Sequence, residues 1–161
     1  MVSDRAQGQA GADGITRIVE VGVKPETARE ATAEAWLVST PEAVAELIAG
    51  TKKGSPLETA KVAGMMAVKR TPDLLPHCHP LRISGADVVV DPDRDDGRIR
   101  VQTTVRAIDR TGVEMEALTA AAVAALSLYD TAKAFDRAAR IEGVRLLSKS
   151  GGESGDYRAA D

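Results

Sequence analysis

The feature that most restricts how this chain can fold is a long helical segment whose middle is apolar on nearly every side. The segment starts at Thr111, which has capping-box spacing to Glu114, and is expected to run to about Arg140. Its central residues, 118–128, are rich in alanine. A helix without a polar face must be buried, and its small side chains let other backbones approach closely. We therefore expect this helix to occupy the core and to take part in contacts between subunits.

Length and charge indicate one globular domain that does not bind nucleic acid through bulk electrostatics. The 161 residues suit a single buried core, and 21 basic against 24 acidic residues give a net charge of −3. A charge-driven nucleic-acid binder would carry the opposite sign. Residues 1–14 are expected to form a disordered polar tail, residues 15–157 the domain, and residues 158–161 a short C-terminal tail.

Cysteine usage and hydropathy favour the cytoplasm. Cys78 is the only cysteine, so no disulfide can form within the chain. No apolar run approaches the roughly 20 residues that a membrane helix needs, and the polar N-terminal residues do not have the pattern of a secretory signal. We expect a reducing compartment and no membrane attachment.

Hydrophobic periodicity and capping residues divide the chain into strands and helices. Residues 26–38 combine helix-forming composition with a period-two pattern, and the pattern favours a strand for their second half. Thr40 and Ser55, each followed by a proline, are N-cap signals for two further helices, which end at Gly50 and near Arg70. The other strands are expected at residues 15–23, 81–90, 98–108 and 144–148.

The order of the core elements indicates the fold class. It is strand, helix, strand, strand, helix, strand, without an internal repeat. This order is typical of an α+β fold, the ferredoxin-like sandwich, in which an antiparallel sheet packs against helices. We expect that architecture here.

The two histidines and the cysteine of the chain are consecutive, His77, Cys78 and His79, between two prolines. One interpretation is a zinc site, because His and Cys are zinc ligands, although the looser spacing typical of such sites is missing. A second is a rigid loop that presents imidazole and thiol groups to a polar ligand. A third is a partly buried turn with incidental histidines. The residues alone leave these open and favour ligand contact over metal.

Asp130 and Lys133 share one face of the long helix, because they lie three residues apart. In a buried helix such a pair can shift each other's pKa and act as an acid/base couple. The ordinary alternative is a helix salt bridge worth a few tenths of a kcal/mol. Glu116 lies within roughly 40° of Asp130 around the helix but about 21 Å from it along the axis. One small ligand can contact both only if Glu116 precedes the helix proper or two subunits contribute.

Three lysines stand beside glycine turns or helix ends: Lys53, Lys69 and Lys149. Helix N-termini and glycine turns expose backbone N–H groups that bind phosphate. Neither glycine loop has the Walker or dinucleotide pattern, and solvated lysines are the commoner explanation. The sequence therefore allows a phosphate site without locating one.

Several of these segments together resemble the MoaC family, the cyclic pyranopterin monophosphate synthases of molybdenum cofactor biosynthesis. The resemblance extends from about Ile18 to Tyr157, and its motifs are long and colinear. The segments that carry it are residues 76–81, 111–120, 128–134 and 144–152. It implies an enzyme that converts a cyclised dihydro-GTP derivative into cyclic pyranopterin monophosphate and pyrophosphate without a metal or other cofactor. It also implies ferredoxin-like subunits in a hexamer, a trimer of dimers, with active sites at the dimer interface.

The resemblance also implies roles for particular residues. Asp130 would be the active-site acid, and Lys133 would take part in proton transfer. The other family positions would line the substrate site or lie near phosphate: the position of His77, then Cys78, His79, Met115, Glu116, Lys53, Lys69, Lys149 and Arg29. The chain departs from the usual family residues at four positions: His77 stands for leucine, Glu20 for aspartate, Thr32 for arginine and Ser55 for aspartate.

Two other functions are compatible with the same residues. One is a catalytically silent oligomer that binds nucleotide or pterin as a scaffold, against which the retention of Asp130, Lys133, His79 and Glu116 argues. The other is a metal-dependent hydrolase. The lyase accounts for the most motifs.

Overall fold

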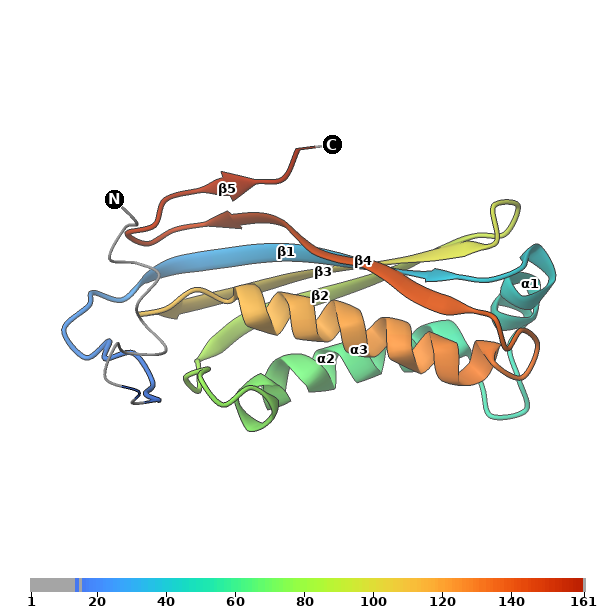
Figure 1. Cartoon of the computed structure of the whole chain (residues 1–161), viewed down its shortest axis with the longest axis horizontal. Coiled ribbons are helices and arrows are strands. Elements are labelled where there is room, and N and C mark those ends of the chain that lie inside the picture. Colours follow the sequence, from blue (N-terminus) through green and yellow to red (C-terminus); the bar gives the residue numbers. More distant parts are fainter. Residues whose placement is uncertain (1–13, 15, 161) are drawn as a thin grey trace.

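The structure, a computed structural model, describes Gly14 and residues 16–160. One antiparallel sheet with the strand order β2-β3-β1-β4-β5 carries the helices α2 and α3 on one side (Figure 1). The elements are β1 (Thr27–Val38), α1 (Pro41–Ala49), α2 (Pro56–Leu74), β2 (Ile83–Asp93), β3 (Arg98–Asp109), α3 (Glu114–Ala132), β4 (Arg140–Ser150) and β5 (Tyr157–Arg158). Leaving out α1 and β5, the order is the expected ferredoxin-like one, so the predicted fold class is confirmed.

Strand β1 lies in the middle of the sheet. It shows that nearly all of residues 26–38, whose sequence is ambiguous between helix and strand, form a strand. Ala31, Ala33, Ala35 and Leu37 alternate along it and are completely buried against the helices. Period-two burial is the mark of a strand with one face on the core, and it overrides the helix-forming composition of the segment. The strand takes up nearly the whole segment, not only its second half.

Helix α3 is the centre of the core, as its alanine-rich sequence predicts. Its fully buried positions are Ala117, Ala120, Ala121, Ala124, Ala125, Leu128 and Ala132. Small residues also let α2 approach: a Cβ atom on Gly64 would lie 3.3 Å from the Ala120 carbonyl oxygen and 3.2 Å from a Val88 methyl group. The Thr103 hydroxyl of β3 donates a 2.7 Å hydrogen bond to the Ala117 carbonyl oxygen, which ties α3 to the sheet.

The predicted strand at residues 15–23 is wrong for the described residues there. Residues 17–21 have no regular secondary structure, and Val23 is 93% exposed. The apolar residues of this segment do not reach the core. Packing against the core therefore does not hold the segment as a strand. Ile15 lies outside the described residues.

Helix α3 is shorter than predicted at both ends. It begins at Glu114 with Val113 as its N-cap, and no side chain caps it, so the predicted capping box from Thr111 does not form. It ends at Ala132, where the Ala132 carbonyl oxygen accepts hydrogen bonds from Phe135 and Asp136 and turns the chain toward β4. Conversely, α2 continues past Arg70 through Pro72 to Leu74, because Thr71 is fully buried and holds the last turn in the core.

The open face of the sheet carries a network of charges. The buried carboxylate of Glu34 accepts hydrogen bonds from Arg100 and Arg145 at 2.8 and 2.7 Å. Burial raises the pKa of Glu34, but these two arginines outweigh burial and lower it overall. The ring of Trp36 lies beside the guanidinium groups of Arg98 and Arg100, 5.2 and 5.7 Å from its centroid.

The described residues include a short strand near the C-terminal end of the chain. The predicted tail at residues 1–14 lies outside the described residues apart from Gly14. At the other end, Tyr157 and Arg158 form β5 by pairing with Lys149 and Ser148 of β4. Over the described part of the chain, no helix combines the length and hydropathy needed to cross a membrane.

The contact of α2 with α3 predicts that Gly64→Leu is destabilising, because its side chain would have to displace Val88 or the Ala120 backbone. We expect the free energy of unfolding to fall by about 1–3 kcal/mol. Denaturant unfolding followed by circular dichroism measures the change. Val62→Leu, at an exposed position of the same helix, should leave stability within about 0.5 kcal/mol of the original. Equal effects of the two substitutions would contradict close packing at Gly64.

Candidate active site

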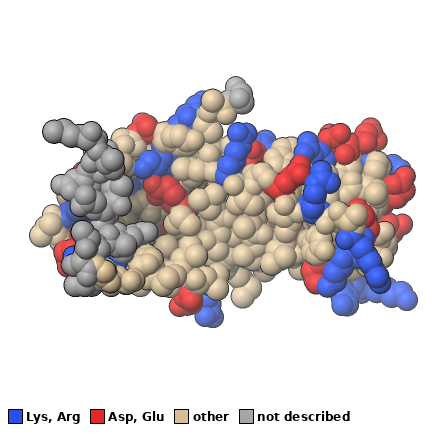
Figure 2. Space-filling view, in the orientation of Figure 1, with Lys and Arg blue, Asp and Glu red and all other residues tan. Residues whose placement is uncertain are grey.

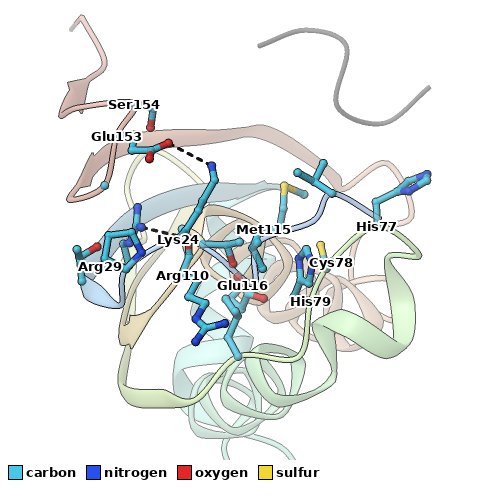
Figure 3. Close-up of a pocket in the computed structure, with 18 residues that line it drawn as sticks. Lys24, Arg29, His77, Cys78, His79, Arg110, Met115, Glu116, Glu153 and Ser154 are labelled. Carbon is cyan, nitrogen blue, oxygen red and sulfur yellow. Dashed lines mark hydrogen bonds and ion pairs between the residues drawn. The ribbon is translucent and has the colours of Figure 1, made fainter. Parts of the chain in front are cut away.

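A pocket of about 830 Å³ opens at one end of the sheet. Four loops and the first turn of α3 meet there: the segment before β1, the loop after α2, the loop between β3 and α3, and the turn between β4 and β5 (Figure 3). Six residues that the resemblance places at the substrate site line it: Arg29, His77, Cys78, His79, Met115 and Glu116. The structure therefore brings these six together from three separate parts of the sequence.

Local structure explains why these side chains reach the pocket. Thr27 and Arg29 are odd-numbered residues of β1, so they lie on the same face as Ala31 and Ala33 but beyond the end of the helical layer. Because α3 begins only at Glu114, Met115 and Glu116 belong to its first turn and face the pocket directly. The late start of α3 thus helps to form the site.

Glu116 is the most unusual group in the pocket. The residue is only 3% exposed, and no described residue forms an ion pair with it. Burial is the main reason that the pKa of Glu116 rises to about 7; the charge of Glu114 adds to this and a backbone N–H opposes it. The thiol of Cys78 has a raised pKa for the same reason, burial, with a further contribution from the negative charge of Glu116. Glu116 can therefore exchange a proton near neutral pH.

Arg29 supplies a fixed positive charge to the pocket wall. Its guanidinium donates to the backbone carbonyl oxygens of Asp109 and Arg110 at 3.4 and 3.2 Å. No carboxylate of a described residue pairs with it, so its charge is available to an anionic ligand.

Two further cations, Arg110 and Lys24, line the pocket. Neither of them was predicted from the sequence. Arg110 donates to the Gly22 carbonyl oxygen at 2.8 Å, and Lys24 forms a 3.3 Å ion pair with Glu153 across the pocket (Figure 3). Arg110 directly precedes the motif that begins at Thr111, which is the one signal that could have drawn attention to it. Lys24 stands in a segment with no such signal.

Two residues that line the pocket, His77 and Thr27, each have a buried polar atom, Nδ1 and Oγ1, without a hydrogen-bond partner in the described part of the chain. The ring of His77 extends away from the side chains of Cys78 and His79 (Figure 3). His77 therefore forms a separate part of the wall from Cys78 and His79.

Asp130 and Lys133 lie at the opposite end of α3 from the pocket. They form a 2.6 Å ion pair, but it is not buried as expected: the side chains are 75% and 55% exposed. The hydrogen bond and charge of Lys133, with the charge of Lys53, lower the pKa of Asp130, and the hydrogen bond with Asp130 raises the pKa of Lys133. Asp130 comes fourteen positions after Glu116, which is about 21 Å along the helix axis. Within one chain, the two groups do not meet.

The three predicted lysines do not line the pocket. Lys149 lies in an adjoining open groove, where it contacts Glu114 at 3.1 Å and Ser154 at 2.6 Å. Lys69 is exposed on α2, and Lys53 precedes α2 near enough to Asp130 to affect its pKa. Among the residues that the structure describes, no three His, Cys, Asp or Glu side chains are grouped as metal ligands would be.

The fold is that of a ferredoxin-like α+β protein, and its pocket is lined by both cationic and acidic side chains. Residues 18–152 match the model of the MoaC family. The chain is 51% identical to the cyclic pyranopterin monophosphate synthase of Parvibaculum lavamentivorans, over 91% of this chain and 92% of that protein. It is 50% identical to that of Deinococcus radiodurans, over 92% and 88%, and 52% identical to that of a Methylobacterium species, over 92% and 93%. The chain belongs to the MoaC family.

The raised pKa of Glu116 predicts a pH-dependent stability. Folding favours the protonated form, so this stabilisation is complete below about pH 4.5 and is lost as the pH rises toward 7. At pH 8, Glu116→Gln should remove the cost of burying the charge and raise the free energy of unfolding by up to about 3 kcal/mol, with little difference at pH 4.5. Denaturant unfolding at both pH values measures this.

Glu58→Gln is the matched control, because Glu58 is the third residue of α2 as Glu116 is of α3, but is exposed. It should show no such gain at pH 8. A Glu116→Gln effect that is the same at both pH values would contradict the raised pKa.

Proposed function

We propose that this chain is a cyclic pyranopterin monophosphate synthase, a lyase of molybdenum cofactor biosynthesis that converts a cyclised dihydro-GTP derivative into cyclic pyranopterin monophosphate and pyrophosphate. Membership of the MoaC family and three relatives of that name support it. The observation that carries it is the pocket, which gathers Arg29, Cys78, His79, Met115 and Glu116 around a volume of about 830 Å³. A nucleotide-sized ligand fits such a volume.

The charges of the pocket suit this substrate. Arg29 and Arg110 place two cations around it, and a third, Lys24, is ion-paired with Glu153; pyrophosphate departure requires positive charge where negative charge develops. The N-terminus of α3, with its partial positive charge, opens into the same space. Glu116 adds a carboxyl group that can give or take a proton near neutral pH. One pocket thus holds cations for the anionic substrate and a carboxyl group that can take part in proton transfer.

We further propose that the complete site takes Asp130, Lys133 and Lys53 from a second copy. A partly exposed stripe of α3 connects the pocket to this group, and its middle carries only apolar residues: Ala122, Val123 and Leu126. Figure 2 shows that the surface over α2 and α3 is largely uncharged. Leu126 is 56% exposed, which an interface would cover.

The numbering of α3 supports antiparallel pairing of two copies along this stripe. A two-fold axis midway between Ala122 and Val123 places Met115 of one copy level with Asp130 of the other, because both lie equally far from the axis. Each dimer then has two sites, and each site has a pocket from one copy and an acid/amine pair from the other. A hexamer, a trimer of such dimers, is the assembly that the family resemblance implies.

Within that site, Lys133 is the general acid or base and Asp130 sets its pKa. In the single chain the exposed ion pair keeps Lys133 protonated, because hydrogen bonding to Asp130 raises its pKa. Burial against the partner subunit disfavours the charged amine and moves its pKa toward neutrality. The interface would therefore activate the lysine as well as place it.

The remaining expectations are part of the same proposal. The enzyme uses no metal or cofactor, does not bind nucleic acid and works in the cytoplasm as a single domain over residues 15–157. The single cysteine, which lines the pocket, supports a reducing location.

An assay of the purified protein with the cyclised dihydro-GTP derivative tests the function. Asp130→Asn and Lys133→Ala should each lower turnover by at least about 100-fold, since general acid–base catalysis contributes that much. Asp73→Asn and Arg70→Ala are matched controls, because these residues form an exposed pair of the same spacing on α2. Binding without turnover by the unmodified protein would instead favour the silent scaffold, which the same pocket could serve.

Mixing two inactive variants tests the shared site. Arg29→Ala removes the pocket cation, and Lys133→Ala removes the proposed acid or base. After unfolding and refolding together in equal amounts, half of the dimers are mixed and each mixed dimer has one intact site, so about a quarter of the original activity should return. No recovery in reassembled oligomers would contradict a site built from two copies.

A further inference from the structure

The turn after β4 begins with two glycines, Gly151 and Gly152, whose φ angles are +88° and +84°. Other residue types rarely adopt this conformation. A Cβ atom on Gly151 would overlap the Ala28 carbonyl oxygen, and one on Gly152 would overlap Nη1 of Arg29. The backbone of Gly152 therefore packs directly against the Arg29 guanidinium.

The guanidinium of Arg29 is held from the other side by the loop after β3. Its Nε and Nη2 atoms donate to the carbonyl oxygens of Asp109 and Arg110. The third nitrogen, Nη1, is the one that Gly152 contacts. Arg29 thus lies between two loops, and both Arg29 and Gly152 line the pocket.

We infer that Gly152 is a positioning residue: because it lacks a side chain, the turn at residues 151–155 confines the Arg29 guanidinium at the pocket wall, where it binds a phosphate group of the ligand. This rests on the proposed function for the identity of the ligand. A planar guanidinium held on two of its three nitrogens keeps a fixed orientation, and a phosphate group needs such an orientation for a pair of hydrogen bonds.

The neighbouring glycines distinguish this role from a general need for a flexible turn. Gly155 lies in the same turn with a φ of +71°, but nothing lies within 4 Å of a Cβ atom placed on it. A methyl group on Gly152 meets the end of a flexible side chain, whereas one on Gly151 meets backbone. Gly152→Ala therefore displaces the Arg29 side chain with little other effect on the fold. The backbone strain of placing alanine at a positive φ angle is common to Gly152→Ala and Gly155→Ala.

The test measures binding of inorganic pyrophosphate by calorimetry and KM and kcat for the cyclised dihydro-GTP derivative. Gly152→Ala should weaken pyrophosphate binding and raise KM by about tenfold, the loss of one charged hydrogen-bonding partner, with a smaller change in kcat. Gly155→Ala should change neither by more than about twofold. In an Arg29→Ala background, Gly152→Ala should not weaken pyrophosphate binding any further, because it acts through Arg29.

Three results would overturn the inference. They are equal effects of Gly152→Ala and Gly155→Ala, a full Gly152→Ala effect in the Arg29→Ala background, or no pyrophosphate binding by the unmodified protein. If pyrophosphate binds and depends on Gly152 while the dihydro-GTP derivative is not turned over, the positioning role stands and the proposed reaction fails. The two proposals are thereby separated.

Discussion

Close packing of α3 against α2 and the sheet is the constraint on which the rest of the structure depends. Alanine occupies most of its buried positions, and Gly64 of α2 lies against Ala120. Small side chains bring the helix axes and the sheet close together, so little room is left for adjustment. The direction of α3 is therefore fixed, and with it the places where its two ends emerge: one in the pocket and the other beside Lys53.

The two ends of α3 have opposite electrostatic character. At the N-terminal end, Glu116 is buried without an ionic partner among the described residues and has a raised pKa. At the C-terminal end, Asp130 and Lys133 are exposed and paired, which keeps both charged. The N-terminal end of the helix thus presents a carboxyl group that binds a proton near neutral pH. The ion pair at the C-terminal end does not exchange protons near neutral pH unless its environment changes. A reaction with several proton transfers can use both kinds of group.

Where local chemistry decides the structure, the sequence predicted it. Thr40 and Ser55 cap α1 and α2 through hydrogen bonds from Ala43 and Glu58, because these bonds depend on residues within one turn. The failures depend on tertiary contacts. The predicted strand at residues 15–23 had the right alternation but reaches no core, and the capping box at Thr111 gave way to a helix that begins at Glu114. The predicted fold class was correct despite these errors, because the period-two and helical patterns of the core segments are strong.

The same division applies to the candidate site. His77, Cys78 and His79 stood out because such a cluster is rare in sequence, and the resemblance added Arg29 and Glu116. Arg110 and Gly152 were not predicted as site residues, although Gly152 closes the segment 144–152 that resembles the family. The place of Arg110 depends on where β3 ends, and the contact of Gly152 with Arg29 joins residues 123 positions apart. Only the three-dimensional structure shows that Gly152 contacts Arg29 and that Arg110 lines the pocket.

The position of Trp36 has a practical consequence. It is the only tryptophan of the chain, and it lies on the open face of the sheet between Arg98 and Arg100, on the side of β1 opposite to Arg29. Its emission therefore reports on the integrity of the central strands from a place that a ligand in the pocket does not touch. Unfolding can be followed by tryptophan fluorescence while the pocket is occupied, so ligand-induced stabilisation can be measured without an optical contribution from direct contact between ligand and indole.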